Sequence, residues 1–264
     1  MSAVILIPAR YASTRYPGKP LVMLRGPDGE KSLIQRSWEA ARRVRGADAV
    51  HVLTDDERIA RAASGFGASV LMTSTAARNG TERCAEALDM LDQEPEIIIN
   101  LQGDAPLTPP WFVEALIEAM EQDAGAAVAT PVLKCGRRTL ENFIADRRAG
   151  KVGGTTCVMD TGRRALYFSK EVLPFVGELT AESPLPEVYH HVGVYAYRPQ
   201  ALRAYRSLPQ GALEKAEGLE QLRFLENGIA VLCVPVQARG RVFWELNNPV
   251  DVARIEKILQ EGQP

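Results

Sequence analysis

Short apolar runs alternate with amphipathic stretches through the first half of the chain. Consecutive apolar residues, as in Ala3–Ile7, are typical of strands buried on both faces, whereas apolar residues three or four positions apart, as in Leu33–Arg45, predict helices. The strands expected are Ala3–Ile7, Val50–Leu53, Ser69–Met72 and Glu96–Leu101, and the helices are Leu33–Arg45, Asp55–Gly65, Thr81–Leu91 and Pro109–Gln122. This alternation favours a three-layer α/β fold with a mainly parallel sheet.

The regular alternation ends near residue 126. Less regular strands are expected at Ala126–Val132, Thr155–Met159, Leu166–Phe168 and Val192–Tyr197, separated by Gly- and Pro-containing loops. We expect the segment 126–197 to form an antiparallel extension or a dimerisation arm. A helix at Glu214–Glu226, a strand at Val231–Val236 and a last helix at Pro249–Leu259, with Asn248 as its N-cap, complete the pattern. The chain is interpreted as one domain, 1–264, with its core in 1–125 and 198–264.

Composition narrows the class of protein and of partner. Of the 264 residues, 46% are hydrophobic and 24% are charged, as in globular proteins that bury a core. A net charge of −2 gives no reason to expect nucleic acid as a partner, so an anionic ligand must be held by a local basic cluster. The first apolar run is too short for a signal-peptide core or a membrane span. We therefore expect a cytoplasmic protein with no membrane contact.

A basic loop follows the first predicted strand. Within ten residues it carries Arg10, Ser13, Arg15 and Lys19. Open α/β sheets bind ligands beyond the carboxyl ends of their strands, and a polyphosphate needs fixed cations, for which Arg provides bidentate donors and Lys a point charge. A solvated basic loop is the alternative, but three cations with a hydroxyl at this place favour a polyphosphate site.

Two further segments carry candidate chemistry, each with a plain structural alternative. Asp104 lies in Asn100–Pro106, directly after an apolar strand, where its carboxylate could bind a hard cation such as Mg²⁺. The alternative is that Asp104 only caps a turn. Gly80 and Thr81 lie in Asn79–Arg83, at the expected start of a helix, where backbone N–H groups could bond a base or a phosphate. The alternative is that this segment only begins the helix.

The predicted helix Glu214–Glu226 carries a polar face. Glu217, Glu220 and Gln221 are spaced i, i+3 and i+4, so they would share that face and could bond a hydroxyl-rich ligand, unless the face is only solvated. Gly26–Ser32 superficially resembles a phosphate-binding P-loop but lacks the spacing that this motif requires.

Together these segments resemble the CMP-Kdo synthetases, the 3-deoxy-manno-octulosonate cytidylyltransferases. The matching stretches are Ile7–Leu21, Thr54–Asp56, Asn79–Arg83, Asn100–Asp104, Ala165–Ser169, His191–Tyr197 and Leu219–Arg223, in the family's order. The resemblance implies a nucleotide-diphospho-sugar transferase type fold, a homodimer and Mg²⁺ dependence. It also implies CTP and an acidic sugar, Kdo, as partners in lipopolysaccharide biosynthesis. The anomeric hydroxyl of the sugar acid attacks the α-phosphorus of CTP, and pyrophosphate leaves.

The resemblance assigns roles to residues of this sequence. Arg10, Ser13, Arg15 and Lys19 would hold the triphosphate, and Asp104 would ligate Mg²⁺, so that Arg10, Lys19 and Asp104 are the expected catalytic residues. The other substrate-binding residues would be Gly80, Thr81, Arg83, Gln102, His191, Tyr195, Glu217, Glu220 and Gln221.

Two positions depart from the family pattern. Asn247 stands where the family has a second Mg²⁺-binding Asp, so metal binding should weaken or shift, with Glu245 as a candidate to compensate. Thr155–Val158 lacks a lysine that could meet the carboxylate of the sugar. Kdo remains the leading acceptor. A different acidic sugar, a phosphonate, and a CTP-binding regulator without catalysis remain alternatives.

Overall fold

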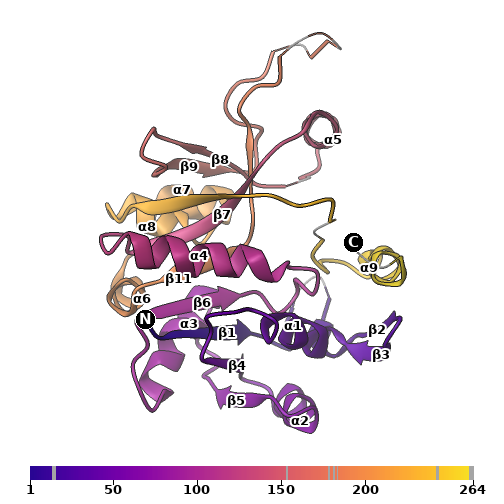
Figure 1. Cartoon of the computed structure of the whole chain (residues 1–264), viewed down its shortest axis with the longest axis vertical. Helices are drawn as coiled ribbons and strands as arrows, with labels where there is room; N and C mark the ends of the chain where they lie inside the picture. The colour runs from indigo at the N-terminus through magenta and orange to yellow at the C-terminus, as the bar shows by residue number, and fades with distance from the viewer. Residues whose placement is uncertain are drawn as a thin grey trace.

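One large sheet organises the protein. The computed structural model describes residues 1–13, 16–152, 154–177, 179–180, 182, 184–241 and 244–261 (Figure 1). Within them the strand order is β5-β4-β1-β6-β11-β7-β10-β8-β9, with β12 also paired to β7. These strands are β1 (Ala3–Pro8), β4 (Ala49–Thr54), β5 (Ser69–Met72), β6 (Ile97–Leu101), β7 (Val128–Lys134), β8 (Thr156–Met159), β9 (Ala165–Ser169), β10 (Tyr189–His191), β11 (Val194–Tyr197) and β12 (Val231–Val236). A separate hairpin pairs β2 (Met23–Gly26) with β3 (Gly29–Ser32).

The pairing of the strands changes direction across the sheet. β5, β4, β1 and β6 are parallel, as are β7 and β12. β11 runs antiparallel to β6 and β7, and the remaining pairs, β7 with β10, β10 with β8 and β8 with β9, are also antiparallel. This confirms the predicted α/β fold with a parallel core and an antiparallel extension. The extension continues the central sheet.

Helices cover both faces of the sheet and produce three layers (Figure 1). α1 (Leu33–Ala41), α2 (Glu57–Gly65) and α4 (Pro110–Gln122) pack on one face, and α3 (Gly80–Ala87), α6 (Pro199–Ser207) and α8 (Leu222–Glu226) pack on the other. β1 shows why its sequence is continuously apolar: Ile5 and Ile7 join one core, while Val4 and Leu6 join the other. The other helices are η1 (Lys19–Leu21), η2 (Leu88–Met90), α5 (Arg137–Arg148), α7 (Ala212–Glu217) and α9 (Asp251–Gln260). A bilayer-crossing helix would need more length and apolar character than any helix in the described part of the chain has.

The predicted helix Glu214–Glu226 is wrong, because the chain breaks it at Gly218. That residue has a φ of +63°, and its N–H donates to the carbonyl oxygen of Glu214 at 2.7 Å. A left-handed residue ends a helix, and glycine adopts this conformation without steric cost. α7 therefore ends before Gly218, and α8 begins only at Leu222.

The start of the last helix also needs correction. α9 begins at Asp251, and Asn248 is not its N-cap. Instead the Asp251 carboxylate reaches back and accepts hydrogen bonds from the N–H groups of Asn247, at 3.0 Å, and Asn248, at 2.7 Å. The apolar pattern also does not predict α5, α6, β10 or the β2–β3 hairpin.

The carboxyl ends of β1 and β6 meet at one edge of the sheet. β11 starts at the same edge, because Val194 pairs with Leu101 at the end of β6. Gly103 lies tightly against this edge. A methyl group there would sit 2.8 Å from the carbonyl oxygen of Pro8 and 3.4 Å from the Ile34 side chain. The loop after β6 is therefore in direct contact with the end of β1.

Gly103→Ala is expected to destabilise the protein by about 1–3 kcal/mol, the usual cost of overpacking, because the new methyl group meets backbone that cannot rotate aside. Gly65→Ala is the control, since a methyl group at this helical position meets nothing within 4 Å. Its stability should stay unchanged or rise slightly. Urea unfolding of both variants checks the difference, and equal stabilities would contradict the close approach.

Candidate active site

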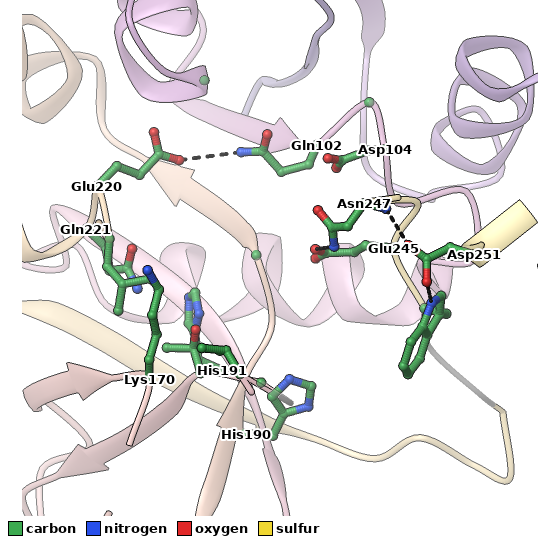
Figure 2. Close-up of a pocket in the computed structure, with 18 of the residues that line it drawn as sticks. Gln102, Asp104, Lys170, His190, His191, Glu220, Gln221, Glu245, Asn247 and Asp251 are labelled. Carbon is green, nitrogen blue, oxygen red and sulfur yellow. Dashed lines mark hydrogen bonds between the residues drawn. The ribbon is translucent and has the colours of Figure 1, made fainter. Parts of the chain in front are cut away.

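A cleft of about 1580 Å³ opens at the carboxyl edge of the sheet (Figure 2). The loops after β1 and β6, the start of α3, the bend between β10 and β11, the turn between α7 and α8, and residues before α9 contribute to its wall. The predicted site residues that line it are Arg10, Ser13, Lys19, Gly80, Arg83, Gln102, Asp104, His191, Tyr195, Glu220, Gln221 and Asn247. Thr81 and Glu217 are not among the described residues that line it, and Arg15 lies outside the described residues.

The basic loop is folded so that Lys19 reaches Asp104. The Nζ atom of Lys19 lies 2.6 Å from Oδ2 of Asp104, and both side chains are largely buried. The turn depends on Gly18, whose φ is +71° and at which a methyl group would lie 3.1 Å from the ring of Tyr11. The guanidinium of Arg58 stacks 3.3 Å from the centre of that ring. Tyr11 and Gly18, at the two ends of the loop, are therefore held against each other.

Arg10 and Ser13 line the same cleft. The Nη1 atom of Arg10 donates to the carbonyl oxygen of Arg78 at 3.4 Å, and Oγ of Ser13 accepts from the N–H of Tyr16 at 3.4 Å. With Lys19 they bring two cations and a hydroxyl to the lining of the same cleft. Such an arrangement can hold a polyphosphate.

Asp104 shares its corner of the cleft with Glu245 and Asn247. The N–H of Leu246 donates to the carbonyl oxygen of Asp104 at 2.9 Å, which places the residues on either side of Leu246 next to Asp104. Nδ2 of Asn247 lies 3.5 Å from Oε2 of Glu245, and both side chains are seen close to Asp104 in Figure 2. Asp251 fixes this segment through its bonds to the Asn247 and Asn248 N–H groups.

This corner has the chemistry of a Mg²⁺ site. Two carboxylates and an amide oxygen are hard donors, and in nucleotide sites Mg²⁺ is usually bound through one or two carboxylates together with phosphate oxygens. Within the described ranges, no group of three or more His, Cys, Asp or Glu side chains is suited to a metal.

The start of α3 lies against the residue that follows β6. Asn79 caps the helix, since its Oδ1 accepts from the N–H of Glu82 at 2.8 Å. Gly80 touches Gln102: a methyl group there would lie 2.9 Å from Nε2 of that side chain. The absence of a side chain at Gly80 thus allows Gln102 to lie flat along the cleft wall.

Thr81 and Arg83 are bound to partners inside the protein. The N–H of Thr81 donates to Oε2 of Glu220 at 3.2 Å, and its hydroxyl bonds that of Tyr197 at 2.9 Å. Arg83 is 3% exposed, and its Nη2 lies 3.3 Å from Oδ2 of Asp55. Thr81 therefore acts through Glu220, whereas Arg83 lines the cleft with its charge already compensated.

The side of the cleft away from Asp104 offers neutral hydrogen-bonding groups. Burial lowers the pKa of His190 to about 4, and burial together with repulsion from His190 lowers the pKa of His191 to about 3. Both rings are therefore neutral at physiological pH. The Tyr195 hydroxyl donates to Oε1 of Gln221 at 3.0 Å. The Nε2 atoms of His191 and Gln221 are buried and have no hydrogen-bond partner among the described residues.

Buried polar atoms of this kind are costly unless something bonds them, so they mark positions for the polar groups of a ligand. Glu220 and Gln102 extend the same surface, with Nε2 of Gln102 3.5 Å from Oε1 of Glu220 (Figure 2). Burial raises the pKa of Glu220, against the effect of the N–H group of Thr81. This side can bond several hydroxyl groups at once.

Glu217 does not share a face with Glu220 and Gln221, so that part of the prediction is wrong. The break at Gly218 separates them, and the Glu217 carboxylate accepts instead from the Ser169 hydroxyl at 2.6 Å and the Lys170 N–H at 2.9 Å. The prediction assumed one continuous helix.

Lys170 is a cleft residue that the sequence pattern did not single out. It directly follows β9 and lines the cleft, and its Nζ lies 3.2 Å from the position that a Cβ atom of Gly218 would take. It brings an ammonium group to the side that holds His191 and Gln221 (Figure 2). Its place directly after Ala165–Ser169 is the signal that could have identified it.

The chain is similar to known cytidylyltransferases over most of its length. Residues 4–231 match the family model described as cytidylyltransferase. The chain is 41% identical to a 3-deoxy-manno-octulosonate cytidylyltransferase of Maricaulis maris, with 100% of this chain and 99% of that protein covered. It is 37% identical to a mitochondrial 3-deoxy-manno-octulosonate cytidylyltransferase of Arabidopsis thaliana, with 97% and 82% covered.

A solved structure agrees with these relatives. It is a CMP:2-keto-3-deoxy-manno-octonic acid synthetase complexed with CTP, which has a TM-score of 0.83 at 34% identity and 98% coverage of both chains. A 4-diphosphocytidyl-2C-methyl-D-erythritol synthase from Anaerococcus prevotii, at 11% identity and a TM-score of 0.57, shares the fold alone. Because the family model spans most of the chain and the relatives match it end to end, this chain belongs to the cytidylyltransferase family, among relatives named 3-deoxy-manno-octulosonate cytidylyltransferase.

Proposed function

We propose that this protein transfers CMP from CTP to the anomeric hydroxyl of 3-deoxy-D-manno-octulosonate (Kdo) and releases pyrophosphate. The observation that carries the proposal is one cleft with two chemically different sides. Lys19 is paired with Asp104 on one side, and neutral donors and acceptors with Lys170 lie on the other, while Arg10 also lines the cleft. The first side suits a triphosphate, and the second suits a hydroxyl-rich acid. The relatives are named for this activity, and the similar solved structure contains CTP.

The reaction depends on positioning and charge neutralisation. The anomeric oxygen forms a bond to the α-phosphorus while the bond from that phosphorus to the oxygen bridging to the β-phosphate breaks. The electron pair leaves with pyrophosphate, and the hydroxyl proton passes to solvent. Arg10 and Lys19 would hold the oxygens of the leaving group, and Gln102, Glu220 and Gln221 would orient the acceptor.

The proposal includes Mg²⁺ as the cofactor. Asp104 would hold it, with the carboxylate of Glu245 and the amide oxygen of Asn247 as further donors. When bound, the ion would neutralise phosphate charge. Support comes from the hard oxygen donors that the Leu246–Asp104 backbone bond brings together.

An acidic acceptor fits the position of Lys170. The segment Thr155–Val158 has no lysine where the family has one, so β8 offers the carboxylate of the sugar no cationic partner. Lys170, which directly follows β9, brings an ammonium group to the same cleft. The proposal places the reaction in the cytoplasm, where CTP is available, and in lipopolysaccharide biosynthesis, the use that the resemblance implies for activated Kdo.

Pyrophosphate release tests the function. With CTP, Mg²⁺ and Kdo, we expect release that depends on all three. Pyrophosphate release with another sugar acid or a phosphonate, but not with Kdo, would show that Kdo is not the acceptor. CTP binding measured by calorimetry without release from any acceptor would point to a regulator instead.

Variants of the metal corner test the cofactor. Asp104→Asn is expected to lower turnover by about 100-fold or more, while the circular dichroism spectrum stays that of the wild type. Asn247→Asp is expected to tighten Mn²⁺ binding, measured by electron paramagnetic resonance, because it adds a carboxylate. The exposed Asp89→Asn is the control. Unchanged Mn²⁺ affinity in both Asp104→Asn and Asn247→Asp would remove the metal from this corner.

The proposal also includes a homodimer formed through the arm 126–197. Phe175 is 90% exposed on this arm, and Leu166, at 64%, projects from β9. β9 is the last strand in the sheet order, and the arm extends away from the core in Figure 1. Exposed apolar side chains next to an open sheet edge are the usual features of a contact surface, and a second copy of the chain is the partner that we propose.

Sedimentation velocity tests the dimer. The wild type is expected to sediment with twice the mass of the 28.9 kDa chain. Phe175→Glu should weaken the association by about 10-fold or more, because it places a charge in an apolar contact. Met90→Glu, at an exposed position outside the arm, is the control. A wild type that remains monomeric at micromolar concentration contradicts the dimer.

A further inference from the structure

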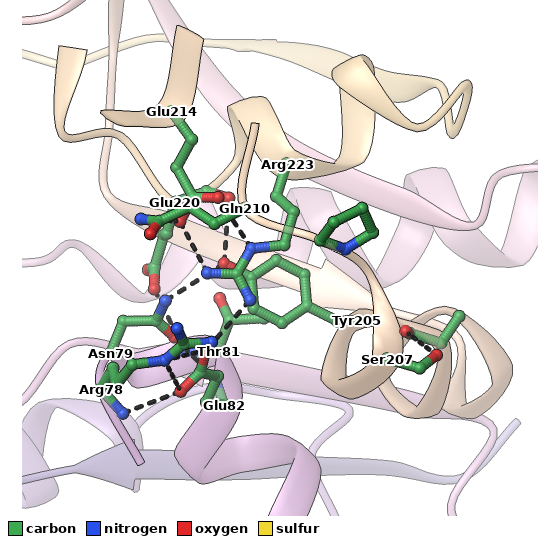
Figure 3. A network of polar contacts seen from close by, with 12 residues as sticks. Arg78, Asn79, Thr81, Glu82, Tyr205, Ser207, Gln210, Glu214, Glu220 and Arg223 are labelled. Atoms are coloured by element: carbon green, nitrogen blue, oxygen red, sulfur yellow. Dashed lines mark hydrogen bonds and ion pairs between the residues drawn. The ribbon is translucent and has the colours of Figure 1, made fainter. Parts of the chain in front are cut away.

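One buried arginine supports the turn that carries Glu220 and Gln221. Arg223 follows this turn in α8, and its side chain is 1% exposed. Its Nε and Nη2 atoms donate to the two carboxylate oxygens of Glu214, both at 2.7 Å. Its Nη1 donates to Oε1 of Glu82 in α3 at 3.0 Å. Figure 3 shows the guanidinium between the α7–α8 segment and the start of α3.

Tyr205 joins the same two segments. The guanidinium carbon of Arg223 lies 4.2 Å from the centre of its ring. Its hydroxyl donates to the carbonyl oxygen of Glu220 at 3.1 Å and accepts from Nδ2 of Asn79 at 3.1 Å. Since Asn79 caps α3, a single hydroxyl connects the helix cap with the backbone of the turn.

The carboxylate of Glu220 adds a third connection, because it accepts from the N–H of Thr81 in α3. The turn is therefore held to α3 in three ways. The Glu220 backbone is joined to Asn79 through Tyr205, the Glu220 carboxylate bonds Thr81, and Arg223 bonds Glu82. The Gly80–Gln102 contact lies beside this junction. The wall that faces the acceptor and the start of α3 are thus fixed as one unit.

Glu82 is shared between two arginines with different surroundings. Arg78 lines the cleft, is 64% exposed, and places Nη2 2.6 Å from Oε1 of Glu82. Burial opposes the charge of Glu82, but hydrogen bonds from Arg78 and Arg223 outweigh it and lower the pKa of this carboxyl to about 2. Glu82 therefore has a buried partner, Arg223, besides the exposed Arg78.

We infer that Arg223 is a positioning residue for the acceptor: by holding Glu214 and Glu82 at once, it sets the orientation in which Glu220 and Gln221 face the cleft. The inference rests on the proposed function. It requires the planar fork of arginine, because a lysine ammonium carries the same charge but cannot bond both carboxylates with that geometry. Arg223 itself touches no substrate.

Two variants test this role. Arg223→Lys is expected to raise the KM for Kdo by about 10-fold or more, since small displacements of orienting groups have effects of this size, while the dissociation constant for CTP changes less than threefold. Tyr205→Phe keeps the stacked ring, loses the bonds to Glu220 and Asn79, and is expected to shift the KM for Kdo in the same direction by a smaller factor. Arg206→Lys is the control, because Arg206 lies next to Tyr205 in α6 but forms an exposed ion pair with Asp89.

The outcomes separate positioning from mere support of the fold. A structural role lowers the melting temperature and the active fraction, and therefore kcat, with both KM values unchanged, and that result would overturn the inference. Equal increases for CTP and Kdo would also overturn it. Should Arg223→Lys fail to fold, Tyr205→Phe decides alone. Failure of the proposed function looks different, because the wild type itself would then release no pyrophosphate with Kdo.

Discussion

The ion pair between Lys19 and Asp104 is the contact around which the cleft is built. It joins the loop after β1 to the loop after β6, and the Leu246 N–H on the Asp104 carbonyl adds a third segment from the end of the chain. Both charged groups are partly buried, so leaving either without a partner carries some desolvation cost. Under the proposed function, a polyphosphate that attracts Lys19 would leave Asp104 free to bind the proposed cation. Triphosphate binding and metal binding would then be coupled through this ion pair.

The side of the cleft away from Asp104 depends on a different set of interactions. Besides Lys170 and Glu220 it offers neutral hydrogen-bonding groups, and two of them, Nε2 of His191 and of Gln221, are buried without a partner among the described residues. Such atoms hold their direction only if the surrounding backbone is rigid. The charged cluster of Arg223, Glu214 and Glu82 supplies that rigidity from behind the turn. On this side a buried ion-pair cluster therefore acts indirectly, by fixing the turn that carries Glu220 and Gln221, while Lys170 brings a charge to the cleft itself.

The sequence predicts the Lys19–Asp104 side of the cleft better than the side that Arg223 supports, for a physical reason. Arg10, Lys19 and Asp104 follow strongly apolar strands, so periodicity alone places them at one sheet edge. The continuous helix 214–226 fails because Gly218 adopts a left-handed conformation, for which the only local signal is the glycine itself. α5 escapes the pattern because it buries little beyond Leu140 and Phe143 in an otherwise polar stretch. The Arg223–Glu82 bond joins residues 141 positions apart, and no local pattern encodes such a pair.

Asn247 can be judged more sharply from the structure than from the sequence. Its backbone is fixed, because its N–H bonds Asp251 and its neighbour Leu246 bonds Asp104. Asn247 therefore offers an amide oxygen from a fixed backbone position but brings no charge. Glu245, two residues earlier and in contact with the Asn247 amide, returns a carboxylate to the same corner. Its side chain is longer and loses more rotamer freedom when it is held. The metal that we propose for this corner would therefore meet two carboxylates and an amide oxygen, but with a greater ordering cost than two aspartates would impose.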